Sequence, residues 1–211
     1  DFNASGADDG LAIDDLVIHP FILTRSNGSS IDAGTYQNVN VVGTTTLNGN
    51  VTIQKQFKFT NAGRLILNNH TVTIEGYIKG PSNFTGSTAS GIVVAGSGAL
   101  EGNINFDQTT PGTSNLLGNI TINRSSQTIT LGNAVRLTNT LTLTTGTLAT
   151  GGNLTLVSNA TNEARVAAIG GSASITGNVI AERYIPASAR NWRFISPSVS
   201  GSNVDDWHNE I

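Results

Sequence analysis

Gly118-Asn-Ile-Thr-Ile122, Thr140-Leu-Thr-Leu-Thr144, Gly152-Asn-Leu-Thr-Leu156 and Ala173-Ser-Ile-Thr-Gly177 are four versions of one short phrase. Each alternates an apolar residue with Thr or Ser, the period-2 pattern of a β-strand with one buried face. Gly or Asn stands at most edges of the phrase, where turns are expected. The sequence has no carboxylate between Asp107 and Glu163, which indicates architecture rather than chemistry in this region.

Related Gly-Asn-apolar phrases recur along the chain at irregular intervals that fit multiples of roughly 16 to 25 residues. Such a repeat is typical of a solenoid, in which each coil is too small to bury its apolar face alone and is stabilised by its neighbours. The sequence therefore predicts an all-β fold, a right-handed parallel β-helix or β-solenoid of short irregular coils. A β-sandwich is the alternative, since it also has short strands separated by turns. No long helix is expected.

Composition narrows the function classes. The 211 residues are 37% hydrophobic and only 12% charged, with a formal net charge of −3. That balance argues against a nucleic-acid partner, which would require a basic face. There is no Cys, hence no disulfide framework or thiolate metal site, and no apolar run approaches the ~20 residues of a membrane span. There is also no Met, so the chain is expected to be a processed product or a fragment.

Individual strands are predicted to be short and separated by corners. Examples are expected near Gln37–Val42 and Thr44–Leu47, with loops inserted at Pro81–Ser90 and Gln108–Ser114. Asparagines are expected to stand at corners, where they tolerate left-handed backbone or form side-chain contacts between coils. These corner residues are Asn50, Asn103, Asn119, Asn139, Asn153 and Asn178.

The start of the chain reads differently from the rest. Residues 1–24 contain a strand pattern at Leu11–Ile18 that resembles the last strand of jelly-roll, lectin-like domains of secreted bacterial proteins. The resemblance implies the final strand or tail of an upstream domain. Four carboxylates flank this strand and offer hard oxygen ligands of the kind Ca²⁺ requires, so a structural calcium site is the alternative to solvated acids. These residues are Asp8, Asp9, Asp14 and Asp15.

The C-terminal part changes composition again. The runs Gly177-Asn-Val-Ile-Ala-Glu-Arg-Tyr-Ile-Pro186 and Asn191-Trp-Arg-Phe-Ile-Ser-Pro-Ser-Val199 follow the Thr- and Asn-rich region. Together they resemble a segment of large secreted surface proteins of Bacteroidetes, including gliding-associated adhesins. The resemblance implies a type IX secretion substrate at the cell surface, outside the outer membrane, that meets the secretion machinery during export. Surface glycans or other cell-surface components are the expected partners. The repeats predict that residues 25–180 form the solenoid, and the change of composition predicts that residues 181–211 form a cap and the start of a downstream module.

An enzyme is the alternative to a structural role, because β-helices can be polysaccharide lyases or hydrolases. Such enzymes need clustered carboxylates with a cation to stabilise developing charge. The solenoid region offers single, scattered acids, of which Glu101 and Asp107 could converge with Lys79 or Arg136. Solvated turn charges are the favoured interpretation, and the chain is predicted not to be an enzyme. No cofactor is expected apart from the calcium alternative.

Two surface features have competing interpretations. The Thr-x-Thr arrays at Thr71–Thr73, Thr128–Thr130 and Thr140–Thr144 would suit ice binding if they aligned, but the strict short repeat that would align them is missing. Ordinary outward-facing strand threonines are therefore favoured. Aromatic residues near the C-terminus could stack on sugars or close the open end of the solenoid, and the cap is favoured. These residues are Tyr184, Trp192 and Phe194.

Overall fold

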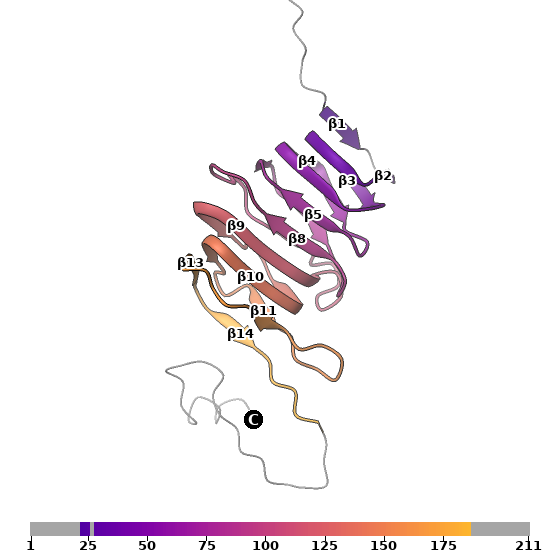
Figure 1. Cartoon of the computed structure of the whole chain (residues 1–211). Coiled ribbons are helices and arrows are strands. Elements are labelled where there is room, and N and C mark those ends of the chain that lie inside the picture. The colour runs from indigo at the N-terminus through magenta and orange to yellow at the C-terminus, as the bar shows by residue number, and fades with distance from the viewer. Residues whose placement is uncertain (1–21, 26–27, 187–211) are drawn as a thin grey trace, which may run out of the picture.

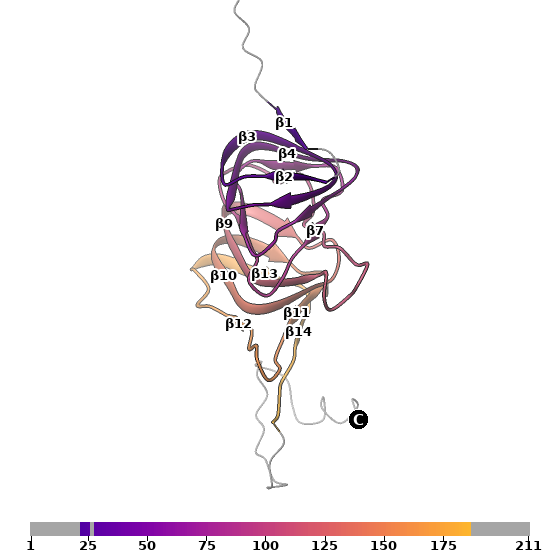
Figure 2. The same cartoon turned by 90° about the vertical axis from the view of Figure 1, so that its right-hand side faces the viewer.

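The computed structural model describes residues 22–25 and 28–186, and these form a β-solenoid of about 6 turns. Fourteen strands belong to one sheet, and every pairing between named strands is parallel. The strands stack from β1 at one end to β14 at the other (Figure 1), and β3 and β4 curve around the stack (Figure 2). No helix occurs within the described ranges. The predicted all-β solenoid is thus confirmed in preference to the sandwich.

The parallel ladder extends from Ile22 to Ala181 in the order β1-β3-β4-β5-β8-β9-β10-β11-β14. Shorter strands pair beside this path with β3, β4 and β10. The strands are β1 (Ile22–Arg25), β2 (Ser29–Ile31), β3 (Gly34–Leu47), β4 (Val51–Ile66), β5 (Thr71–Ile74), β6 (Tyr77–Lys79), β7 (Phe84–Thr85), β8 (Gly91–Val94), β9 (Leu116–Thr130), β10 (Val135–Ala149), β11 (Leu154–Leu156), β12 (Arg165–Val166), β13 (Ser172–Thr176) and β14 (Val179–Ala181).

Several strands are longer than predicted. The separate strands expected near Gln37–Val42 and Thr44–Leu47 are both parts of β3, which has 14 residues, and β4 reaches 16. These strands bend around the solenoid without ending, because a residue with positive φ turns the chain while its neighbours keep pairing with the next coil. Gly43 has φ 71° within β3, and Gly146 has φ 88° within β10. Corners that look like strand ends in the sequence are therefore bends within one strand.

Asparagine positions also differ from the prediction in part. The asparagines with positive φ are Asn61, Asn68 and Asn69, and none of the six predicted corner asparagines is among the described residues with positive φ. The predicted contacts between coils do occur at two of the six. The side chain of Asn50 accepts a hydrogen bond from the Thr71 amide, and that of Asn153 donates to the Leu131 carbonyl.

The core lies inside the coils and is built by the period-2 alternation. In β5, for example, Val72 and Ile74 are buried while Thr71 and Thr73 are half-buried on the other face. One buried cluster of Val, Ile, Leu and Phe runs through the stack. Four phenylalanines pack in series, with ring centroids 4.6 Å apart for Phe57 and Phe59, 5.5 Å for Phe59 and Phe84, and 6.2 Å for Phe84 and Phe106.

Coil length varies because the connections vary while the strands stay in register. Partners on adjacent coils are 16 residues apart at Ile22 and Asn38 and 28 apart at Gly91 and Asn119. The predicted loop at Gln108–Ser114 contributes to the long coil and is confirmed. The predicted loop at Pro81–Ser90 is wrong in part, because it contains β7 and buries Phe84. A two-residue strand flanked by Ser, Asn and Gly carries too little pattern to be recognised.

None of the described residues belongs to a helix long and apolar enough to cross a membrane.

Gly76 marks a place where successive coils come into close contact. A Cβ atom built on Gly76 would lie 1.6 Å from the carbonyl oxygen of Lys55 on the preceding coil. Because that oxygen belongs to the backbone, two coils would have to move apart locally. We expect Gly76→Ala to lower the free energy of unfolding by about 2–3 kcal/mol, the usual cost of overpacking. Urea unfolding followed by circular dichroism measures this loss.

Gly171 provides the matched control for Gly76→Ala. No heavy atom lies within 4 Å of the position of its Cβ, and its φ is not positive. Gly171→Ala should therefore change stability by less than ~0.5 kcal/mol, the range of ordinary surface substitutions. Equal losses in the two variants would contradict the stacking geometry at Gly76.

Candidate functional site

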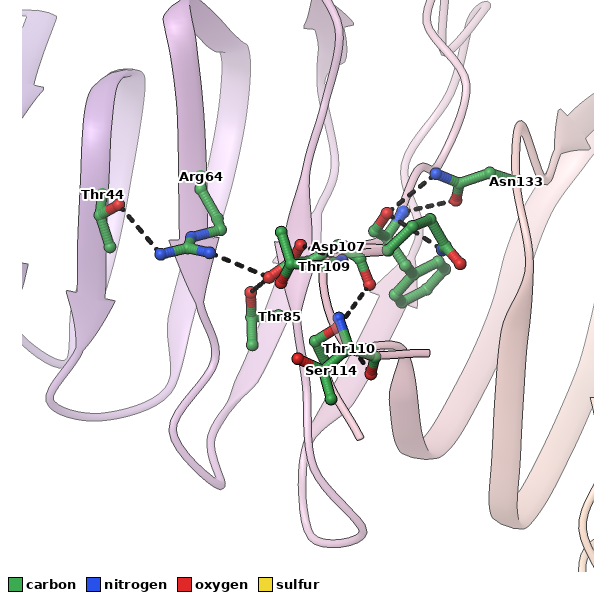
Figure 3. Close-up of polar contacts among 10 residues, drawn as sticks. Thr44, Arg64, Thr85, Asp107, Thr109, Thr110, Ser114 and Asn133 are labelled. Atoms are coloured by element: carbon green, nitrogen blue, oxygen red, sulfur yellow. Dashed lines mark hydrogen bonds and ion pairs between the residues drawn. The ribbon is translucent and has the colours of Figure 1, made fainter. Parts of the chain in front are cut away.

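The most buried carboxylate of the described chain, Asp107, links three successive coils (Figure 3). Its Oδ2 atom accepts hydrogen bonds from Arg64 Nη1 at 3.0 Å and from Thr85 Oγ1 at 3.1 Å. Its Oδ1 atom accepts one from the Thr109 amide at 2.9 Å. Arg64 also donates to Thr44 Oγ1 at 3.3 Å. The group therefore ties the inserted loop after Asp107 to the coils before it.

Electrostatics agree with this structural role. Burial by itself raises the pKa of the Asp107 carboxyl. The amide and hydroxyl of Thr109, the hydroxyl of Thr85 and the Arg64 guanidinium together outweigh burial and lower this pKa from 3.8. Asp107 is therefore ionised at neutral pH with its oxygens occupied, which is unlike a general acid or base that must exchange a proton near pH 7.

Arg124 is a buried cation that pairs with no carboxylate of residues 22–25 and 28–186. Its side chain lies in β9, and the residue is only 1% exposed. Nε donates to the Gly98 carbonyl at 2.7 Å, Nη1 to the Ala95 carbonyl at 2.8 Å, and Nη2 to the Ser97 carbonyl at 3.0 Å. A longer contact of 3.4 Å reaches the Ala99 carbonyl. Residues 95–99 thus form a cradle of carbonyl oxygens that the chain fills with its own guanidinium.

The carbonyl cradle depends on its backbone conformation and on the charge of Arg124. Gly96 and Gly98 have φ of 79° and 80°, which lets carbonyls within five residues converge on one point. Burial lowers the pKa of Arg124, but an arginine in a protein keeps its charge at neutral pH. The cation is therefore a structural clamp for the loop. No motif in the sequence around Arg124 indicates this role.

The C-terminal end of the solenoid gathers the remaining ion pairs. Arg136 Nη2 donates to Glu182 Oε1 at 2.6 Å, and Glu182 Oε2 accepts the Ser158 amide at 3.3 Å. Arg183 and Glu163 are 3.8 Å apart and exposed. The convergence of Glu101 and Asp107 with Lys79 or Arg136, the less favoured alternative, does not match the ion pairs, because Asp107 pairs with Arg64 and Arg136 with Glu182. The favoured interpretation, solvated turn charges, is wrong for Asp107, which is buried.

The predicted site residues lie mostly outside the part that the structure describes. The candidate calcium ligands Asp8, Asp9, Asp14 and Asp15 precede Ile22. Two of the three aromatic residues, Trp192 and Phe194, follow residue 186. Tyr184 is described: it is 45% exposed, and its amide donates to Ser158 Oγ at 3.0 Å. Within residues 22–25 and 28–186, no group of three or more His, Cys, Asp or Glu residues could hold a metal ion.

One polar face of the sheet carries threonines that strand pairing brings into rows, an alignment that the sequence analysis did not predict. Along this face, outward-facing residues of successive coils are register partners, so they form two rows that we call the threonine face. The first row is Thr35, Thr52, Thr73, Val93, Thr121 and Thr142. The second row is Asn50, Thr71, Gly91, Asn119 and Thr140.

The threonine face lies directly over the core. In three of its strands, the inward residues between or beside the rows are buried, for example Val72, Ile120 and Leu141. The two rows contain no charged residue and no aromatic residue. The alignment survives because loops absorb the uneven spacing between coils, and the missing strict repeat therefore did not prevent it.

Comparisons of the chain with protein-family models, with curated proteins and with solved structures found no match. The class of protein is defined here by its fold, a β-solenoid repeat protein.

Proposed function

We propose that this chain is a non-catalytic structural and adhesive β-solenoid segment of a large secreted bacterial surface protein. The observation that carries the proposal is the uninterrupted parallel ladder from Ile22 to Ala181. Each coil is bonded to the next through backbone hydrogen bonds and shares one core with it, which is the construction of a stiff rod. A rod of this kind suits a spacer that holds other modules away from a cell surface.

The state of the charged groups supports a non-catalytic role. Asp107 and Glu182 are engaged in ion pairs and backbone hydrogen bonds that join coils or loops. Arg124 is fully used by carbonyl oxygens. A catalytic carboxylate needs access to substrate and a pKa suited to proton transfer, and Asp107 has neither.

The location and partners are proposed from the resemblance of residues 177–199 to Bacteroidetes surface proteins. Export by the type IX system would place the chain outside the outer membrane, where surface glycans are the expected partners. Calcium at the acidic start of the chain belongs to the same proposal. A nucleic-acid partner does not, because the net charge is −3.

A carbohydrate-binding or polysaccharide-degrading β-helix is the second candidate. The observation that favours it is the exposure of Tyr184, because aromatic side chains present an apolar face on which sugars can stack. Tyr184 follows Glu182, the partner of Arg136, by two residues. In the first candidate, Tyr184 belongs to the cap and no glycan is cleaved. In the second, Tyr184 stacks on a sugar, and a degrading enzyme would also cleave the glycan.

The test uses the whole 211-residue chain on a glycan array and in depolymerisation assays with acidic and neutral polysaccharides. We expect no turnover of any polysaccharide, and any glycan retention should survive Glu182→Gln. Sustained release of reducing ends or unsaturated sugars would overturn the non-catalytic proposal. A loss of retention in Tyr184→Ala, with unchanged thermal unfolding, would favour the carbohydrate-binding candidate.

Export is tested separately in the bacterium that encodes the chain. Protease added to intact cells should degrade the tagged protein in the parent strain and leave it intact in a strain lacking type IX secretion. Equal protease sensitivity in both strains would contradict export by this route.

A further inference from the structure

The first row of the threonine face repeats threonine on five of six successive coils, whereas the second row has threonine only at Thr71 and Thr140. Outward residues two apart along a strand are separated by about 6.6 Å, and partners on adjacent strands by about 4.8 Å. Thr71 and Thr73 form one such pair, and Thr140 and Thr142 another, on strands that stack beside β8 and β9 (Figure 1). The result is one row of threonine hydroxyl and methyl groups across the coils, with a second threonine beside it on β5 and on β10.

The spacing between strands is close to the oxygen repeat along the a axis of hexagonal ice, and the spacing along a strand is somewhat shorter than the repeat along the c axis. Threonine suits such a lattice, because its hydroxyl can take a water position by hydrogen bonding while its methyl group fills the space between waters. A β-branched side chain held in a strand also has few rotamers, so little side-chain entropy is lost when it meets an ordered surface.

We propose that the threonine face binds the surface of ice crystals. This activity goes beyond the spacer role and does not depend on it. Individual threonine–water contacts are weak, but the solenoid presents them together on one body, so that they add as in multivalent binding. Val93 and Gly91 interrupt the rows at β8, where Val93 keeps a methyl group and loses the hydroxyl.

The composition of the threonine face favours ice over other occupants. A polysaccharide site would be expected to offer aromatic rings for stacking, and the rows contain none. A protein interface would be expected to have an apolar, aromatic-rich centre. The absence of charge within the rows means that no strongly hydrated ion disturbs water ordered over the face.

To test this proposal, ice is grown slowly from a solution of the full chain, and the fraction of protein taken into the ice is measured. Inhibition of ice recrystallisation is measured in parallel. Thr121→Tyr places a bulky ring near the centre of the rows and should prevent simultaneous contact, so incorporation should fall about tenfold. Thr128→Tyr is the matched control. Thr128 is exposed and pairs with Thr147 in a different column of the solenoid, so incorporation should not change.

A gain-of-function variant keeps the test informative. Val93→Thr is nearly isosteric and restores the missing hydroxyl between Thr73 and Thr121, so it should increase inhibition of recrystallisation. Thermal unfolding of each variant confirms that its fold is retained.

Two results would overturn the proposal. One is exclusion of the wild-type chain and Val93→Thr from ice, as for an inert protein. The other is an equal loss of incorporation in Thr121→Tyr and Thr128→Tyr. Binding to insoluble chitin or cellulose without incorporation into ice would assign the face to a crystalline polysaccharide instead.

Discussion

Replacing Arg124 by methionine is expected to lower the free energy of unfolding by about 3 kcal/mol, because buried acceptors without donors cost about 1–3 kcal/mol each. Methionine keeps an apolar stem of similar volume, so the core contact is largely preserved. What is lost is the donor set for the carbonyls of Ala95, Ser97 and Gly98, which all lie within 3.0 Å of the guanidinium. Water can reach the exposed part of this loop. The loss in free energy of unfolding should therefore be smaller than the sum of the costs of three unpaired carbonyls.

Arg124→Lys separates charge from geometry. A lysine ammonium keeps the positive charge but presents it as one compact group, which cannot reach carbonyls spread around a planar guanidinium. The loss should therefore lie between those of the wild type and Arg124→Met. Urea unfolding gives the stability, and amide hydrogen exchange should show faster local opening around residues 95–99 in both variants. Full retention of stability in Arg124→Met would mean that the carbonyl cradle is satisfied by water and that the buried cation is dispensable.

The fold class was predictable because solenoid stacking imposes a local signature on each coil. Alternation of apolar and hydroxyl residues, as in Thr140–Thr144, repeats in every turn, so even an irregular period leaves the pattern visible. Strand ends were not predictable, because a bend at Gly43 or Gly146 uses the same residue type as a true turn. Whether the strand continues depends on its pairing with the neighbouring coils. That pairing cannot be read from a short stretch of sequence around the bend.

The candidate sites were less predictable for a related reason. The alignment of Thr73 with Thr121 across Val93 is set by the pairing of β5, β8 and β9, and the loops between these strands differ too much in length for a regular sequence spacing to show it. The partner of Asp107 was likewise hidden, since Arg64 is 43 residues away and two coils distant. A sequence shows which groups exist, whereas the register decides which of them meet.

Asp107 makes a second prediction, on the pH dependence of stability. Its pKa is lowered in the folded state relative to the usual 3.8, so the folded chain holds the proton less tightly than the unfolded chain. Stability from this group is therefore fully present above the unfolded pKa and is lost as the pH falls through the folded pKa. Asp107→Asn removes the charge and should lower the free energy of unfolding at pH 7 by about 2–3 kcal/mol, since three charge-assisted hydrogen bonds are weakened.

The difference between the wild type and Asp107→Asn should narrow as the pH falls below about 4, because the unfolded wild type then binds a proton that the folded wild type binds only at lower pH. Below the folded pKa the two side chains are both neutral. Other carboxylates titrate equally in both proteins and cancel in the difference. Asp32→Asn is the matched control: Asp32 is exposed and accepts a hydrogen bond from Asn48, so its loss should stay within ~0.5 kcal/mol at pH 7. Urea unfolding at a series of pH values measures all three proteins. A difference for Asp107→Asn that stays constant from pH 7 to the lowest pH would show that the Asp107–Arg64 pair contributes through shape rather than charge, and that the ionised carboxylate is not what joins these coils.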